Sequence, residues 1–99
     1  MLIHMFAFRW SPNASAAHKD RAIKEILALQ AVVPGLLEVQ IGKNLSPRGG
    51  EYETGGVMKF ADADALSGFG SHPAHLALIE WLPPLLIEPI EVDFRASSA

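Results

Sequence analysis

The chain opens with the stretch Leu2-Ile3-His4-Met5-Phe6-Ala7-Phe8-Arg9-Trp10, in which two largely apolar series are interleaved. One series comprises Leu2, His4, Phe6, Phe8 and Trp10, and the other comprises Ile3, Met5, Ala7 and Arg9. Because successive side chains of a β-strand point to opposite faces, this stretch predicts a strand that is apolar on both sides. Each of the two faces therefore needs a covering layer.

Downstream of this strand, the residue pattern predicts two helical regions and three more strands. Apolar residues at helical spacing predict an amphipathic helix from Ser15 to Val33, which Pro34-Gly35 ends. A short helix is expected near Asp62–Phe69, followed by a second helix with Ser71 as its N-cap and Pro73 in its first turn. The expected strands cover residues 37–41, with Leu37, Val39 and Ile41 on one face, and residues 54–60 and 90–94. Residues 96–99 form a plain tail.

The order β-α-β-β-α-β predicts a ferredoxin-like α+β fold, with a four-stranded antiparallel sheet that carries its helices on one face. The chain has 99 residues, which is enough for one domain, so residues 1–99 are expected to form a single domain. The opposite face of the sheet would stay bare in a monomer; it comprises Ile3, Met5, Ile90, Val92 and Phe94. Exposed apolar faces of this kind usually mark interfaces, so we expect a homodimer.

Composition narrows the classes of partner. The net charge is −3, with 8 Lys and Arg against 11 Asp and Glu, and no basic cluster is present. A nucleic-acid partner is therefore not expected, because such proteins neutralise phosphates with basic side chains. The chain has no Cys, which excludes disulfides and metal-thiolate sites. Neither a signal peptide nor a membrane span is recognisable, so no membrane partner and a cytoplasmic location are expected.

His4 is the first candidate for chemistry, because it stands among apolar residues on its strand face. A buried imidazole needs a hydrogen-bond partner, and Asp93 or Glu91 on the neighbouring last strand can supply one. A carboxylate there would hold one ring nitrogen and leave the other free as a general base. Two interpretations of His4 stay open at this point. It is either a core histidine whose hydrogen bond only stabilises the fold, or part of a site that transfers protons.

The block His72-Pro73-Ala74-His75 supplies a second candidate at a helix start. Two imidazoles at this spacing can bind a metal, but the sequence offers no third ligand at a matching spacing, so no metal site is expected. We expect one imidazole to point to solvent and the other inward. The positive end of the helix dipole disfavours an imidazolium, so an inward His75 would tend to stay neutral.

Six segments together resemble the stress-responsive A/B barrel family. They are Ile3-His4-Met5-Phe6-Ala7-Phe8, Val33-Pro34-Gly35-Leu36, Gly42-Lys43-Asn44 with Ser46-Pro47, Val57-Met58-Lys59-Phe60, Ser71-His72-Pro73-Ala74-His75 and Val92-Asp93-Phe94. They occur in order from about residue 2 to residue 94. The resemblance implies a dimeric α/β barrel, in which two ferredoxin-like subunits pack sheet against sheet.

Within this family, a plant branch of polyketide cyclases performs aldol condensation without a metal or organic cofactor. The resemblance to that branch implies catalytic roles for His4, His75 and Asp93. Two positions depart from it: Phe69 stands where the branch has a tyrosine, and Thr54 where it has a histidine. An aldol cyclase must stabilise an oxyanion, so the missing hydroxyl at Phe69 removes a donor worth about 2–4 kcal/mol.

Three functional hypotheses follow. The first is a dimeric protein that binds a small, largely apolar carbonyl or aromatic compound, with His75 and His4 at its polar end. The second is a cofactor-independent cyclase, lyase or isomerase that uses His75 as base. The third is a structural, stress-associated dimer without a ligand. The ligand-binding residues expected for the pocket are Phe6, Phe8, Ile23, Ile26, Phe69, His72 and Leu78.

Overall fold

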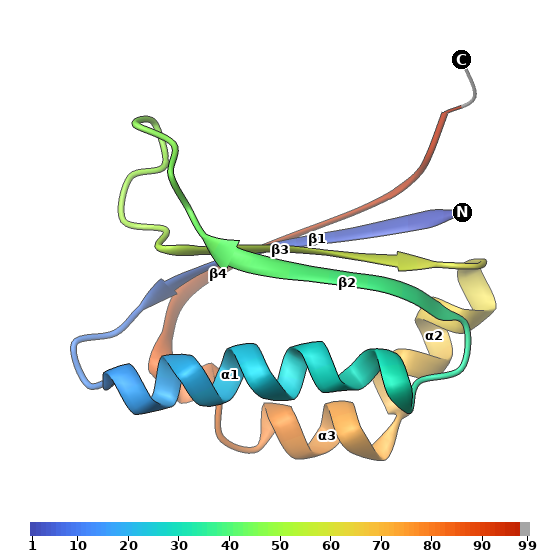
Figure 1. Cartoon of the computed structure of the whole chain (residues 1–99), viewed down its shortest axis with the longest axis horizontal. Helices are drawn as coiled ribbons and strands as arrows, with labels where there is room; N and C mark the ends of the chain where they lie inside the picture. The colour runs from blue at the N-terminus through green and yellow to red at the C-terminus, as the bar shows by residue number, and fades with distance from the viewer. Residues whose placement is uncertain (98–99) are drawn as a thin grey trace.

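The computed structural model describes residues 1–97, so Ser98 and Ala99 of the predicted tail lie outside the described residues. Its elements, shown in Figure 1, are β1 (Leu2–Trp10), α1 (Ala16–Ala28), a 3-10 helix (Leu29–Ala31), β2 (Leu36–Lys43), β3 (Thr54–Phe60), α2 (Ala63–Ser71), α3 (Pro73–Ile79), a second 3-10 helix (Pro83–Leu85) and β4 (Leu86–Arg95). The predicted element order is confirmed, with α2 and α3 together in the place of the second helical region.

The four strands form one antiparallel sheet in the order β2-β3-β1-β4. Figure 1 shows α1, α2 and α3 on the same side of this sheet, with α2 leading from the sheet into α3. This arrangement is the predicted ferredoxin-like α+β fold. Met1 and Ala96 lie next to each other, because β1 and β4 are antiparallel neighbours and the amide of Ala96 donates to the carbonyl of Met1.

The core lies between the sheet and the helices, as the alternation in β1 predicts. Leu2, His4, Phe6 and Phe8 are all buried on the helix side. They pack against residues of the helices and of β3. Among these, Ile26 of α1 and Phe60 of β3 are almost completely buried.

The other face of the sheet is open along β1 and β4. Met5, Ile90, Val92 and Phe94 are between 43% and 48% exposed there. Ile3 lies on this face as predicted, as the register partner of Phe94, but it is only 9% exposed, so the expectation that it is bare in a monomer is wrong. The physical reason is the size of the neighbours: the long side chains of Lys59 and Phe94 flank Ile3, whereas Met5 on the same strand is flanked by the smaller Val57 and Val92.

Two local predictions are also corrected. In β2 the register shifts between Leu36 and Glu38, so Leu36 is buried while Leu37 is exposed; the simple alternation of residues 37–41 is wrong at this point. Such a bulge offsets the side-chain alternation by one residue. The N-cap of α3 is His72 rather than Ser71, because α2 continues through Ser71.

Candidate functional site

A cavity of about 320 Å³ lies between the helix side of the sheet and the helices. Its wall is formed by His4, Phe6, Phe8, Ile26, Met58, Leu66, Phe69, Gly70, His75, Leu78, Ile79, Leu82, Pro83, Leu86, Pro89, Glu91 and Asp93. Most of these side chains are apolar, and the polar ones come from β1, β4 and α3. A mainly apolar hollow with a few convergent polar groups is typical of a small-molecule site.

His4 and Asp93 form the polar pair of the sheet wall. They are cross-strand partners in the β1–β4 register, and Nδ1 of His4 lies 2.5 Å from Oδ1 of Asp93. The imidazole side chain is 10% exposed, whereas the carboxylate side chain is 48% exposed. Because an ionised carboxylate only accepts, Nδ1 donates the hydrogen, and in the neutral ring Nε2 is the unprotonated nitrogen.

His75 supplies the second imidazole of the cavity from the first turns of α3. Its Nδ1 lies 2.9 Å from the carbonyl oxygen of Gly70 in α2. A carbonyl oxygen also only accepts, so Nδ1 of His75 donates, and the neutral ring has its free electron pair on Nε2. Both cavity histidines therefore have the same tautomer imposed by an acceptor at Nδ1.

The phenyl ring of Phe69 contacts both imidazoles. Its centroid lies 4.4 Å from that of His75 and 6.2 Å from that of His4. Phe69 is buried and carries no hydroxyl, so it supplies an apolar surface beside both histidines rather than a hydrogen-bond donor. The position at which the plant cyclases have a tyrosine is therefore part of the cavity wall here.

Most of the predicted site residues meet in this cavity. Those that line it are His4, His75, Asp93, Phe6, Phe8, Ile26, Phe69 and Leu78. Ile23 does not line the cavity. The buried face of α1 is formed by Ala22 and Ile26, and Ile23, the residue after Ala22, points to one side of that face. His72 does not line the cavity either, because its Nδ1 accepts the amide hydrogen of Ala74 and thereby caps α3. Their placement at the pocket is corrected accordingly.

Sequence reasoning missed several cavity residues: Met58, Leu66, Gly70, Ile79, Leu82, Pro83, Leu86 and Pro89. Alternation along β3 was a usable signal for Met58, which is buried on the same face as Phe60. Pro83, Leu86 and Pro89 had no such signal, because their position depends on how the chain passes from α3 into β4.

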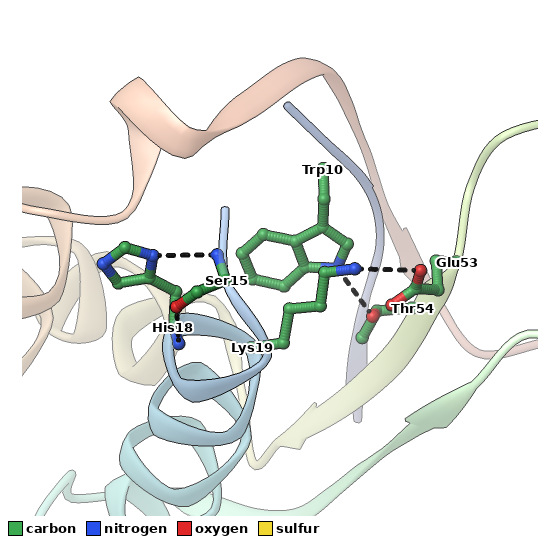
Figure 2. Close-up of polar contacts among 6 residues, drawn as sticks. All are labelled: Trp10, Ser15, His18, Lys19, Glu53 and Thr54. Carbon is green, nitrogen blue, oxygen red and sulfur yellow. Dashed lines mark hydrogen bonds and ion pairs between the residues drawn. The ribbon is translucent and has the colours of Figure 1, made fainter. Parts of the chain in front are cut away.

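Thr54 stands where the plant cyclases have a histidine, and its side chain forms a hydrogen bond outside the cavity. Its hydroxyl oxygen accepts the indole N–H of Trp10 at 3.0 Å, as Figure 2 shows. Beside this pair, the ammonium of Lys19 lies 3.1 Å from a carboxylate oxygen of Glu53. Figure 2 also shows Ser15 and His18 bonded to each other's backbone amides at the start of α1. None of these residues lines the cavity.

The charged residues of the cavity wall are acidic. Glu91 and Asp93 extend from the same face of β4, and none of the described residues that line the cavity is Lys or Arg. Arg95 follows Asp93 on that strand face but is not a lining residue. Among the described residues that line the cavity, only His4 and His75 have side chains able to carry positive charge.

Comparison with known proteins agrees with the resemblance noted in the sequence. The profile of the family described as Stress responsive A/B Barrel Domain matches residues 2–96. The chain belongs to this family. No curated protein sequence matches the chain.

Solved structures share the fold of this A/B barrel protein. A hydroxynitrile lyase from Passiflora edulis is 18% identical with a TM-score of 0.90, over 99% of this chain and 94% of that one. A dimeric ferredoxin-like protein of unknown function from Thermobifida fusca is 24% identical with a TM-score of 0.84, over 96% and 90%. A variant of a cofactor-independent oxygenase from Streptomyces nogalater is 16% identical with a TM-score of 0.78, over 99% and 94%.

Two further findings concern the described part of the A/B barrel chain. Within residues 1–97, no helix is both long and apolar enough to cross a membrane. The same residues contain no group of three or more His, Asp or Glu side chains placed to hold a metal ion.

Proposed function

We propose that residues 1–99 form one A/B barrel domain that pairs with a second copy and binds a small, uncharged carbonyl or aromatic compound in its cavity. The observation that carries this proposal is the pair of imidazoles, each held at Nδ1 by an acceptor, in the wall of one apolar cavity. A fixed Nε2 can accept a hydrogen from a hydroxyl group when neutral. When the ring is protonated, Nε2 donates to a carbonyl oxygen.

The ligand is uncharged in this proposal because of the charge on the wall. A carboxylate ligand would face Glu91 and Asp93 in a hollow that offers no Lys or Arg among its described lining residues. Like charges close together in an environment of reduced dielectric repel strongly. A neutral ligand avoids this repulsion and buries its apolar surface against Phe6, Phe69 and Leu78.

The partner in this proposal is a second copy, packed on the open sheet face. The face presents Met5, Ile90, Val92 and Phe94, four exposed apolar side chains that lie side by side on β1 and β4. The related structure from Thermobifida fusca is described as dimeric, which supports the same assembly here. A sheet face of this kind is favourable to bury because contact removes apolar surface from water.

A titration calorimetry experiment with acetophenone, an uncharged aryl ketone, tests the binding function. We expect the wild type to bind it and His75→Ala to bind it at least about tenfold more weakly, which corresponds to about 1.4 kcal/mol. Leu76→Ala is the matched control, because Leu76 lies on the same helix, is exposed and does not line the cavity. Equal affinity of wild type and His75→Ala would remove His75 from the site. Absence of binding by a panel of neutral ketones and aldehydes would favour a purely structural dimer.

A second candidate function is proton transfer at carbon, with His75 as the base. Its support is the hydrogen bond from Nδ1 to Gly70, which leaves Nε2 of the neutral ring free to accept a proton. In this step Nε2 takes a proton from the carbon next to a carbonyl group, and the electrons of the C–H bond form an enolate. The protonated ring exchanges this proton with water and then returns a solvent-derived proton to the carbon, so the cycle needs no cofactor. The solved hydroxynitrile lyase and cofactor-independent oxygenase support catalysis on this fold.

Exchange of the methyl hydrogens of acetophenone in D2O, followed by proton NMR, distinguishes the two functions. An enzyme of this type accelerates exchange above the buffer rate, and His75→Ala loses the acceleration. If the wild type binds acetophenone without accelerating exchange, the binding function stands and the catalytic one fails.

A further inference from the structure

The floor of the cavity contains a close contact between an aromatic ring and a glycine. Phe6 of β1 and Gly56 of β3 are direct cross-strand partners. An ideal Cβ built on Gly56 would lie 2.5 Å from Cε2 and 2.7 Å from Cε1 of the Phe6 ring, and would overlap Cζ. The ring therefore occupies the space that any side chain at position 56 would need, which is a known use of glycine within strands.

We infer that Gly56 sets the size of the ligand cavity by allowing the Phe6 ring to lie flat against the sheet. This inference rests on the function proposed above and names a residue that determines which ligands fit. Gly56 is not itself a lining residue of the cavity; it acts through Phe6, which is one.

The surroundings of the ring decide where it would move. Along β1 it is flanked by the imidazole of His4, with centroids 5.9 Å apart, and by the ring of Phe8, at 5.0 Å. A methyl group at position 56 would push from the β3 side. The free volume next to the ring is the cavity, so the displaced ring would enter it. Packed interiors do not absorb an added methyl group without such a shift.

The neighbouring glycine provides a matched control. Gly55 precedes Gly56 in β3, and a Cβ on Gly55 would meet no atom within 4 Å. Gly55→Ala and Gly56→Ala therefore make the same chemical change in the same strand, but only the second meets Phe6. Because Gly55 lies on the open face of the sheet, the oligomeric state of both variants is compared by light scattering.

Calorimetric titration with acetophenone and with the larger 2-acetylnaphthalene tests the inference. Gly56→Ala should weaken 2-acetylnaphthalene binding at least tenfold and change acetophenone binding less than threefold, while Gly55→Ala matches the wild type for both. Adding Phe6→Leu to Gly56→Ala shortens the displaced side chain and should restore the larger ligand. A crystal structure of Gly56→Ala should show the Phe6 ring moved into the cavity.

These experiments distinguish a failure of the inference about Gly56 from a failure of the proposed binding function. If Gly56→Ala binds both ketones as the wild type does, or if its Phe6 ring stays in place, the inference is overturned while the binding function stands. If the wild type binds neither ketone, the binding function fails and the inference fails with it. Should Gly56→Ala not fold, the double variant Phe6→Leu/Gly56→Ala decides: it should fold and bind 2-acetylnaphthalene, because the shorter side chain leaves room for the added methyl group, and a double variant that also fails to fold contradicts the inference.

Discussion

Asp93 of β4 holds the imidazole of His4 of β1 through a contact of 2.5 Å between Oδ1 and Nδ1, across the pairing of the first and last strands. The two partners differ in their access to water: the imidazole is 10% exposed and the carboxylate 48%. Water can therefore replace the histidine as a partner of Asp93, but cannot easily replace Asp93 as a partner of the buried Nδ1.

This asymmetry predicts that Asp93→Ala destabilises the protein by about 1–3 kcal/mol, since the buried imidazole loses its acceptor. Asp93→Asn retains an oxygen acceptor and should cost less. Urea denaturation of the three proteins measures the differences. Equal stability of Asp93→Ala and the wild type would mean that His4 does not depend on this contact.

Replacing Met5 and Val92 with Glu should convert the dimer to monomers or unfolded chains. The two residues are register partners on the open sheet face, so the variant places like charges next to each other in the proposed interface. Analytical ultracentrifugation measures the mass. Leu45→Glu serves as the control, because Leu45 is 86% exposed in the loop beyond β2. A double variant that remains a dimer would place the interface elsewhere.

Removing the carboxylate of Glu91 should relax the discrimination against anionic ligands. We expect Glu91→Gln to raise the affinity for benzoate several-fold and to leave acetophenone almost unchanged, because only the anion is repelled by the wall. The measurement is a pair of titrations at low ionic strength, where screening is weak. Glu80→Gln, outside the cavity, controls for net charge. Equal affinity of the wild type and Glu91→Gln for benzoate would mean that the charge of Glu91 does not exclude anionic ligands.

Thr54→Val should destabilise the protein by about 1–2 kcal/mol, because the indole N–H of Trp10 loses its acceptor in a partly buried position. Thr54→Ser keeps the hydroxyl and should recover most of the difference. Thermal unfolding monitored by circular dichroism measures both variants. If valine and serine are equivalent, the hydrogen bond shown in Figure 2 contributes nothing to stability.

Part of the candidate site was predictable because the alternation of side chains along a strand is a local property of the sequence. The polar position at Asp93 and the buried position at His4 both follow from alternation, and the fold makes their strands neighbours. His75 was recognisable from its place at a helix start, although its partner Gly70 was not, since that contact depends on how α2 and α3 meet. His72 was misplaced because an N-cap and a ligand contact use the same kind of side chain.

The sequence by itself determined the element order, the strand face that packs on the helices and the apolar character of the other face. These properties depend on residue periodicity, which is a property of consecutive positions. The tertiary structure alone decided which imidazole nitrogen is held, that Ile3 is covered while Met5 is not, and that the ring of Phe6 lies over Gly56. Such features arise from contacts between residues distant in the chain, where packing and register, rather than local pattern, select the partner.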